Sequence, residues 1–150
     1  MYQYSAEQFL PIDVKSAWSF FSSPQNLALI CPPEMEFKIL TSLTGEEIYD
    51  GMTIDYRVRP LLGIPMHWRT EIMNVQTQKA FTDRQLKGPY AVWEHTHTFT
   101  PQEGGVLMHD LINYQIPYGI IGTFAHSLLI RKKIENIFAY RKKILTDLFK

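Results

Sequence analysis

The spacing of apolar residues changes once along the chain, near Pro117, and this change most constrains the fold. Between residues 34 and 117, alternating apolar and polar segments are separated by short turns that contain glycine or proline. This pattern is typical of antiparallel strands. From about Ile120 to Phe149 the apolar residues recur at helical spacing instead. The sequence therefore predicts an antiparallel meander followed by one long C-terminal helix.

Signals near the N-terminus add one strand and two short helices. Residues 2–10 are predicted to form a strand that ends at Pro11. Asp13 is a suitable N-cap for a helix that begins at Val14, and a second helix is expected at about 24–30. Six further strands are expected at roughly 35–41, 52–59, 65–75, 79–87, 90–100 and 105–116. Since one helix cannot cover seven strands, a hollow should remain between the helix and the sheet.

Composition excludes several classes of function. The 150 residues suit a single domain over 1–150, and 15 basic residues balance 15 acidic ones, so nucleic acid is not an expected partner. No apolar run approaches the ~20 residues of a membrane span, and the N-terminus does not resemble a signal peptide. We therefore expect a soluble, cytoplasmic protein without stable membrane insertion. Its single cysteine, Cys31, should be a structural thiol.

The strand predicted at 90–100 carries the most informative side chains. Because side chains alternate between the two faces of a strand, Trp93, His95, His97 and Phe99 share one face. The aromatic residues require that face to point inward, so both histidines should point inward too. In the next strand the more apolar face contains an acidic residue, Asp110, among Val106, Met108, Ile112 and Tyr114.

Parity within this hairpin predicts a contact. Opposed residues of paired strands share a face. Pairing position 99 with 106 places His95 opposite Asp110, whereas pairing 99 with 108 places His97 there. Either register puts the carboxylate beside one histidine on the inner wall.

Four interpretations of this group remain open. The pair could be structural, since a buried carboxylate needs a hydrogen-bonding partner. It could also anchor a polar atom of a ligand. An acid–base role for His95 or His97 with Asp110 is a third interpretation. A metal held by the same three residues is the least favoured, so we expect no metal or other cofactor. His67, His109 and His126 should be surface or structural residues.

Other strands supply further candidates for an inner wall. Alternation places two sets of residues inward, namely Ile54, Tyr56 and Val58 on one strand and Trp68, Thr70 and Ile72 on another. In the strand at 79–87 the face remains open, because Phe81 favours burial of the face with Asp83 and Gln85, whereas Leu86 favours the other. The loop 114–124 contains Pro117, Gly119 and Gly122, and is a candidate entrance gate.

Several segments together resemble the SRPBCC (START/Bet v 1-like) superfamily. They are FLPIDVKSAWSFFSSPQNL, HWRTEI, FTDRQLKGPYAVWEHTHTF, GGVLMHDLINYQIPYG and IIGTFAHSLLIRKKIENIFAYR, which span nearly the whole chain. The combination GPY-x-x-W-x-H-x-H-x-F followed by L-M-x-D resembles small bacterial members, including the domain found with NAD-dependent epimerase-like proteins.

This resemblance implies an α+β helix-grip fold, with a seven-stranded curved antiparallel sheet, two short helices and a long C-terminal helix. It also implies a deep cavity for a hydrophobic, lipid-like or polycyclic small molecule. Together with the strand analysis, it makes the following residues the candidates for ligand binding: Tyr56, Trp68, Trp93, His95, His97, Phe99, Met108, Asp110, Tyr114 and Phe124.

Three functions follow as hypotheses. The first is binding or transport of a hydrophobic small molecule, and the second is a small cyclase or dehydratase that uses His95 or His97 with Asp110. The third is a regulatory protein with a protein partner or a homodimeric state. It would dock through a basic helix face formed by Arg131, Lys132, Lys133, Arg141, Lys142 and Lys143.

Overall fold

The computed structural model describes residues 1–43, 45, 47–60, 63–117 and 123–150, with the backbone alone described for residues 123–126. Its helices and strands follow the order β1 (Tyr2–Leu10), α1 (Val14–Phe21), η1 (Pro24–Asn26), α2 (Leu27–Ile30), η2 (Pro33–Met35), β2 (Lys38–Ile39), β3 (Thr53–Val58), β4 (Met66–Gln76), β5 (Ala80–Lys87), β6 (Val92–Gln102), β7 (Gly105–Gln115) and α3 (Thr123–Leu148). The predicted order of strands and helices is confirmed.

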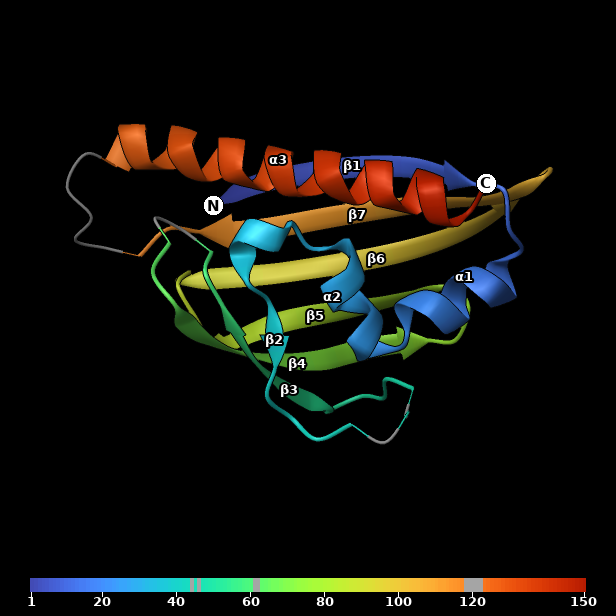
Figure 1. The fold of residues 1–150 in the computed structure, drawn as a ribbon, viewed down its shortest axis with the longest axis horizontal. Helices are drawn as coiled ribbons and strands as arrows, with labels where there is room; N and C mark the ends of the chain where they lie inside the picture. The colour runs from blue at the N-terminus through green and yellow to red at the C-terminus, as the bar shows by residue number, and fades with distance from the viewer. Residues whose placement is uncertain (44, 46, 61–62, 118–122) are drawn as a thin grey trace.

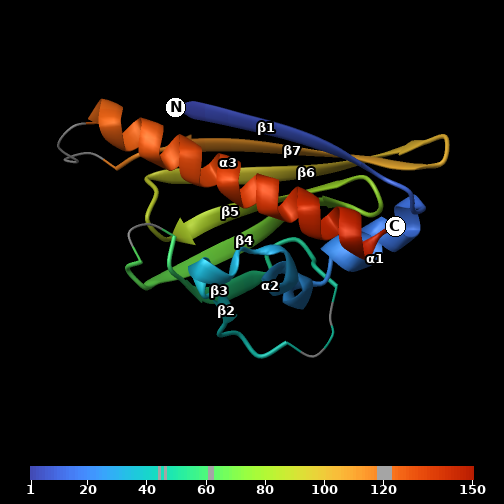
Figure 2. The same cartoon turned by 45° about the horizontal axis from the view of Figure 1, so that its top comes forward.

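The seven strands form one antiparallel sheet in the order β1-β7-β6-β5-β4-β3-β2. Figures 1 and 2 show α3 running along one side of this curved sheet. In both views α1 lies near the C-terminal end of α3, and α2 lies beside the C-terminal half of that helix. Hydrogen bonds from both elements hold α3 beside β1. Arg131 Nη1 donates to the carbonyl of Gln3 over 3.0 Å, and Gln8 Nε2 donates to the carbonyl of Lys142 over 3.0 Å.

Local signals in the sequence explain where α1 begins. The Asp13 side chain accepts a hydrogen bond of 2.7 Å from the backbone N–H of Ser16, which confirms the predicted N-cap. α1 then buries Ala17 and Trp18. The Trp18 ring meets Phe81 and Phe99 of the sheet edge-on, with ring centroids 5.8 and 5.6 Å apart, an arrangement that aromatic quadrupoles favour.

A second group of buried side chains joins α3 to the sheet. It contains Ile112 and Tyr114 of β7 and Ile130, Ile134 and Phe138 of α3. Nearer the C-terminus, Leu145 of α3 packs into the larger core around Trp18. Most of the apolar stripe predicted for the C-terminal helix is therefore the surface that grips the sheet, whereas Leu128 and Leu148, which were expected on it, are exposed.

One predicted strand is much shorter in the structure. The strand expected at 35–41 is reduced to the two residues of β2. The reason is that Pro33–Met35 form a 3₁₀ turn and Glu36 follows in the left-handed region with φ of 45°. The described part of α3 spans Thr123–Leu148; its predicted start near Ile120 and most of the candidate gate fall on residues 118–122, which lie outside the described residues.

One of the six residues predicted for the exposed basic face of the C-terminal helix is not on it. Arg141 is buried, with 6% of its surface exposed. It lies three residues after Phe138 and four before Leu145, which places it on the buried stripe of α3. Lys133 is half-buried, whereas Arg131, Lys132, Lys142 and Lys143 are exposed. Among the described residues, none of the helices is long and apolar enough to cross a membrane.

Replacing Leu145 with alanine tests the grip of α3 on the sheet. Leu145 is 1% exposed, so the loss of its buried methyl groups should lower the free energy of unfolding by about 2–5 kcal/mol. Chemical denaturation followed by circular dichroism measures this change. The matched control is Leu128→Ala on the same helix, which is 57% exposed and should change stability by less than ~0.5 kcal/mol. Equal effects of the two substitutions would contradict this packing.

Candidate functional site

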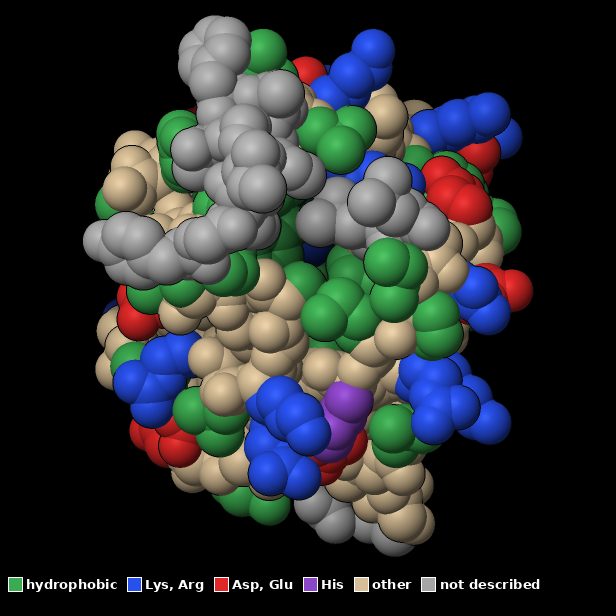
Figure 3. Space-filling model, turned by 90° about the vertical axis from the view of Figure 1, so that its left-hand side faces the viewer, with side chains coloured by type: hydrophobic (Ala, Val, Ile, Leu, Met, Phe, Trp, Pro, Cys, Tyr) green, Lys and Arg blue, Asp and Glu red, His purple; other side chains and the backbone are tan. Residues whose placement is uncertain are grey.

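A cavity of about 180 Å³ lies between the sheet, α2 and α3. Aromatic and aliphatic side chains form most of its wall, including Phe37, Tyr56, Trp68, Tyr90, Trp93 and Phe138. At the end of the molecule where α3 begins, Figure 3 shows a hollow bordered by hydrophobic side chains. An apolar cavity of ~150 Å³ is sufficient to bind benzene, so this space suits a small apolar group.

The structure divides the ten predicted ligand-binding residues into three groups. Those that line the cavity are Tyr56, Trp68, Trp93, His95 and His97. Those that are buried but do not line it are Phe99, Met108, Asp110 and Tyr114. The side chain of Phe124 lies outside the described residues.

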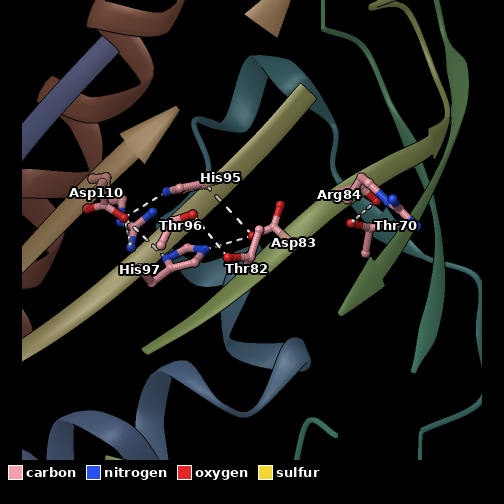
Figure 4. A network of polar contacts seen from close by, with 9 residues as sticks. Thr70, Thr82, Asp83, Arg84, His95, Thr96, His97 and Asp110 are labelled. Atoms are coloured by element: carbon pink, nitrogen blue, oxygen red, sulfur yellow. Dashed lines mark hydrogen bonds and ion pairs between the residues drawn. The ribbon is translucent and has the colours of Figure 1, made fainter. Parts of the chain in front are cut away.

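The polar part of the wall is a chain of histidine and aspartate side chains from three adjacent strands (Figure 4). His95 Nε2 donates a hydrogen bond of 2.7 Å to Asp110 Oδ1. His97 Nε2 donates one of 2.7 Å to Asp83 Oδ2. The other ring nitrogen of His97, Nδ1, lies 3.2 Å from Asp110 Oδ1. The two imidazole rings are stacked, with centroids 3.8 Å apart.

The register of β6 and β7 settles which histidine faces Asp110. Position 99 pairs with 108, so His97 stands opposite Asp110. The hydrogen bond, however, comes from His95, which lies diagonally across the two strands. Both histidines therefore approach one carboxylate, where the sequence predicted a contact with one of them.

Asp83 of β5 belongs to the same group, although the alternation of β5 left its face open. Asp83 pairs with His95 in the β5–β6 register and lines the cavity. Leu86 made the inner face of β5 ambiguous, because it is apolar and alternation places it on the face opposite Asp83. Arg69 pairs with Lys87 while Thr70 pairs with Gln85, so Leu86 is an extra residue in a β-bulge. Strict alternation fails at that point, and the apolar side chain of Leu86 is exposed.

Arg141 brings a positive charge from α3 to this wall, although its place in a basic run predicted a solvent-facing position. Its Nη2 atom lies 3.5 Å from Asp110 Oδ1 and has no hydrogen-bond partner among the described residues. The guanidinium carbon is 5.4 Å from the ring centroids of both Phe21 and Phe138, within cation–π range. Its spacing from Ile134, Phe138 and Leu145 could have predicted that Arg141 is buried, because all four lie on one stripe of α3.

Both carboxylates stay ionised despite burial. Burial alone would raise the pKa of Asp110, but the charge of Arg141 and the hydrogen bond from His95 hold that pKa well below its usual value. Burial likewise opposes ionisation of Asp83, and the charges of His95 and His97 with the hydrogen bond from His97 lower its pKa. Two negative charges therefore lie close to the imidazoles, Asp83 on the cavity wall and Asp110 behind it.

The two histidines differ in pKa. Burial lowers the pKa of His95, the charge of His97 lowers it further, and the interactions with Asp110 and Asp83 do not restore it. Burial also opposes the charge of His97, but its contacts with Asp110 and Asp83 outweigh burial and raise its pKa. His97 is thus the imidazole that holds a proton more tightly. The pair can donate and accept hydrogen bonds on the cavity wall.

Cys31 lines the cavity as well. Burial raises the pKa of its thiol to about 11, so the thiol stays protonated at neutral pH and is a poor nucleophile. This agrees with the structural role predicted for it.

Comparison with known proteins supports the fold, although no family model and no curated protein sequence matches the chain. The di-domain ARO/CYC StfQ from the steffimycin biosynthetic pathway matches over 98% of this chain and 50% of its own, with TM-score 0.71 and 12% identity. Ara h 8.0201, a Bet v 1-type allergen, matches over 97% of this chain and 98% of its own, with TM-score 0.60 and 9% identity.

A nucleoside-diphosphate sugar epimerase from Corynebacterium glutamicum also matches, with TM-score 0.67 and 21% identity over 96% of this chain and 28% of the epimerase. The chain therefore shares the helix-grip fold of these structures, which is the fold that its resemblance to the SRPBCC superfamily implied. At these identities the likeness concerns the fold, and the chemistry has to be argued from the site.

Replacing Asp110 with asparagine should lower the pKa of both His95 and His97, because a neutral amide no longer favours the imidazolium form of either ring. Titration of the imidazole resonances by NMR in chelator-treated protein measures both values. The control is Glu94→Gln, which removes a carboxylate that alternation places on the opposite face of β6 and should leave both values unchanged. Unchanged values in Asp110→Asn would show that this carboxylate does not govern the two histidines.

Proposed function

We propose that this protein binds a hydrophobic small molecule, lipid-like or polycyclic, in the cavity between the sheet and α3, and acts as a binding or carrier protein for it. The observation that carries this proposal is a cavity whose wall is mostly aromatic and aliphatic, with its polar groups gathered in one place. Small-molecule sites commonly combine an apolar wall with a few polar groups that orient the ligand.

The polar groups set the expected character of the ligand. His95, His97 and Asp83 come from neighbouring strands, and Arg141 faces them from α3. Trp68 and Trp93 form an apolar surface in contact with each other, with ring centroids 5.4 Å apart. A ligand with an apolar ring or chain and one oxygen-bearing group fits both parts of this wall.

The comparisons support the proposal at the level of the fold. An aromatase/cyclase and a Bet v 1-type allergen share the helix-grip architecture, which encloses a cavity between sheet and helix. Their ligands cannot be transferred at 12% and 9% identity, so the class of ligand rests on the cavity wall described here.

Filling the cavity should abolish ligand binding. Ile137 of α3 lines the cavity, and Ile137→Trp would occupy part of its 180 Å³. Binding of an apolar fluorescent probe, 1-anilinonaphthalene-8-sulfonate, should weaken by at least about tenfold, which corresponds to ~1.4 kcal/mol. Titration of the probe at fixed protein concentration measures the change.

The control for this experiment is Leu129→Trp, which places the same side chain on an exposed position of α3 and should leave probe binding unchanged. Native mass spectrometry and lipid extraction of the purified protein provide a second test. If no small molecule copurifies and the probe does not bind the unsubstituted protein, the proposed function is wrong.

An enzymatic role is the second candidate, and the specific observation that favours it is the position of both imidazoles on the cavity wall. One imidazole could remove a proton from a bound β-hydroxy carbonyl compound and the other could protonate the leaving hydroxyl, which would eliminate water. Asp110 does not line the cavity, so its contribution would pass through His95 and His97.

Under this second candidate, Asp110→Asn should abolish turnover while leaving probe binding largely unchanged, because the carboxylate tunes the imidazoles without touching the ligand. Mass spectrometry of β-hydroxy carbonyl compounds incubated with the protein detects the loss of water. Full turnover by the variant would exclude the acid–base pair, and absence of turnover by the unsubstituted protein would favour the carrier function.

A further inference from the structure

We propose that Asp83, His95 and His97 form a binding site for a divalent first-row transition metal ion, with Zn²⁺ as its simplest probe, on the wall of the cavity. In the part of the chain that the structure describes, these three residues are the one group of at least three potential metal ligands whose donor atoms all lie within 4.8 Å of one another. All three also line the cavity, so an ion bound to them would face it.

The distances between the donor atoms fit one ion. Asp83 Oδ2 lies 2.7 Å from His97 Nε2 and 3.9 Å from His95 Nδ1. Ligand–metal distances of ~2.0–2.2 Å separate neighbouring donors in a tetrahedral site by roughly 3–4 Å. The ion would replace the hydrogen bond between Asp83 and His97, and the small opening needed there is within the reach of a carboxylate side chain.

Asp110 occupies the position of a supporting group for both histidine ligands. It accepts a hydrogen bond from His95 Nε2, which leaves His95 Nδ1 free to coordinate. The same oxygen is 3.2 Å from His97 Nδ1, which makes no hydrogen bond to a described residue, and a small movement of the ring would let Nδ1 donate to it. His97 Nε2 faces Asp83 and is the coordinating atom. Metal-binding histidines almost always donate their second N–H to a carboxylate, carbonyl or water, and this fixes the ring orientation.

This arrangement differs from the metal site weighed from the sequence. That hypothesis used Asp110 as the third ligand, but Asp110 does not line the cavity and contacts the ring nitrogens that point away from the site. Asp83 takes its place because alternation puts it on the same face of β5 as the buried Phe81, and both line the cavity.

Three protein ligands leave coordination positions open. Sites with two histidines and one carboxylate bind Zn²⁺ or Fe²⁺ and keep at least one position for water or substrate. Here that position would face an apolar cavity, where an oxygen atom of a bound molecule could reach the ion. The metal site extends beyond the proposed function, because metal binding and probe binding are separate measurements and either can fail alone.

The charges at the site agree with a bound cation. Asp83 lines the cavity and Asp110 lies behind the two imidazoles, and both are acidic. The cation nearest Asp110 is Arg141, at 3.5 Å, whereas the ion pairs of Asp83 among the described residues are with His95 and His97. A divalent ion between Asp83 and the two rings would take over this pairing of the carboxylate.

The first test measures Zn²⁺ binding to chelator-treated protein by isothermal titration calorimetry, with metal content checked by elemental analysis. One ion per chain is expected. Asp83→Asn should weaken binding on the order of 100-fold or more, and Asp110→Asn by about 10–100-fold, as for the loss of a supporting group. His109→Asn is the control, because His109 lies on the opposite face of β7, bonded to Ser5, and should not affect binding.

A second test needs no substitution, so it stands even if a variant fails to fold. Co²⁺ added in substoichiometric amounts to the unsubstituted protein should broaden the imidazole resonances of His95 and His97 before those of His67 and His109. Probe binding is measured in parallel with chelator present, which separates this proposal from ligand binding. Absence of stoichiometric Zn²⁺ binding, or first broadening at His67 or His109, would overturn the metal site.

Discussion

Burial of the Asp110 carboxylate is the constraint on which the arrangement of the site depends. A buried charge without partners would cost several kcal/mol, so the surrounding elements must supply donors and positive charge. β6 supplies His95 and His97, and α3 supplies Arg141. The same contacts orient the imidazoles on the cavity wall and align α3 with the sheet. Asp110 of β7 therefore influences both the position of α3, through Arg141, and the polar groups of the cavity wall, through the two histidines.

The inner face of β6 and β7 could be predicted because nothing interrupts their alternation. Trp93 and Phe99 required one face to be buried, and this placed both histidines beside them. The parity of the hairpin then brought Asp110 to the same wall in either register. The diagonal hydrogen bond from His95 could not be predicted, because it depends on side-chain rotamers rather than on which residues are opposed.

Two residues of the site were missed for different physical reasons. The position of Asp83 could not be derived, because Leu86 is apolar yet exposed, and its place on the face opposite Phe81 left the inner face of β5 undecided. Arg141 could have been found, since its spacing from Ile134, Phe138 and Leu145 follows the buried stripe. Its neighbours Lys142 and Lys143 suggested a solvated face instead. Runs of basic residues on a helix therefore need to be assigned residue by residue against the apolar stripe.

The two outer strands of the sheet differ greatly in length, and this affects how the protein avoids self-association. An unpaired strand edge can accept a strand from another molecule and so begin aggregation. At one end β2 has two residues, too few to template such pairing. At the other end β1 has nine residues, but α3 runs beside it. The side chain of Arg131 donates a hydrogen bond to the backbone carbonyl of Gln3 on this strand. The helix that closes the cavity thus also shields the longer edge from strand addition.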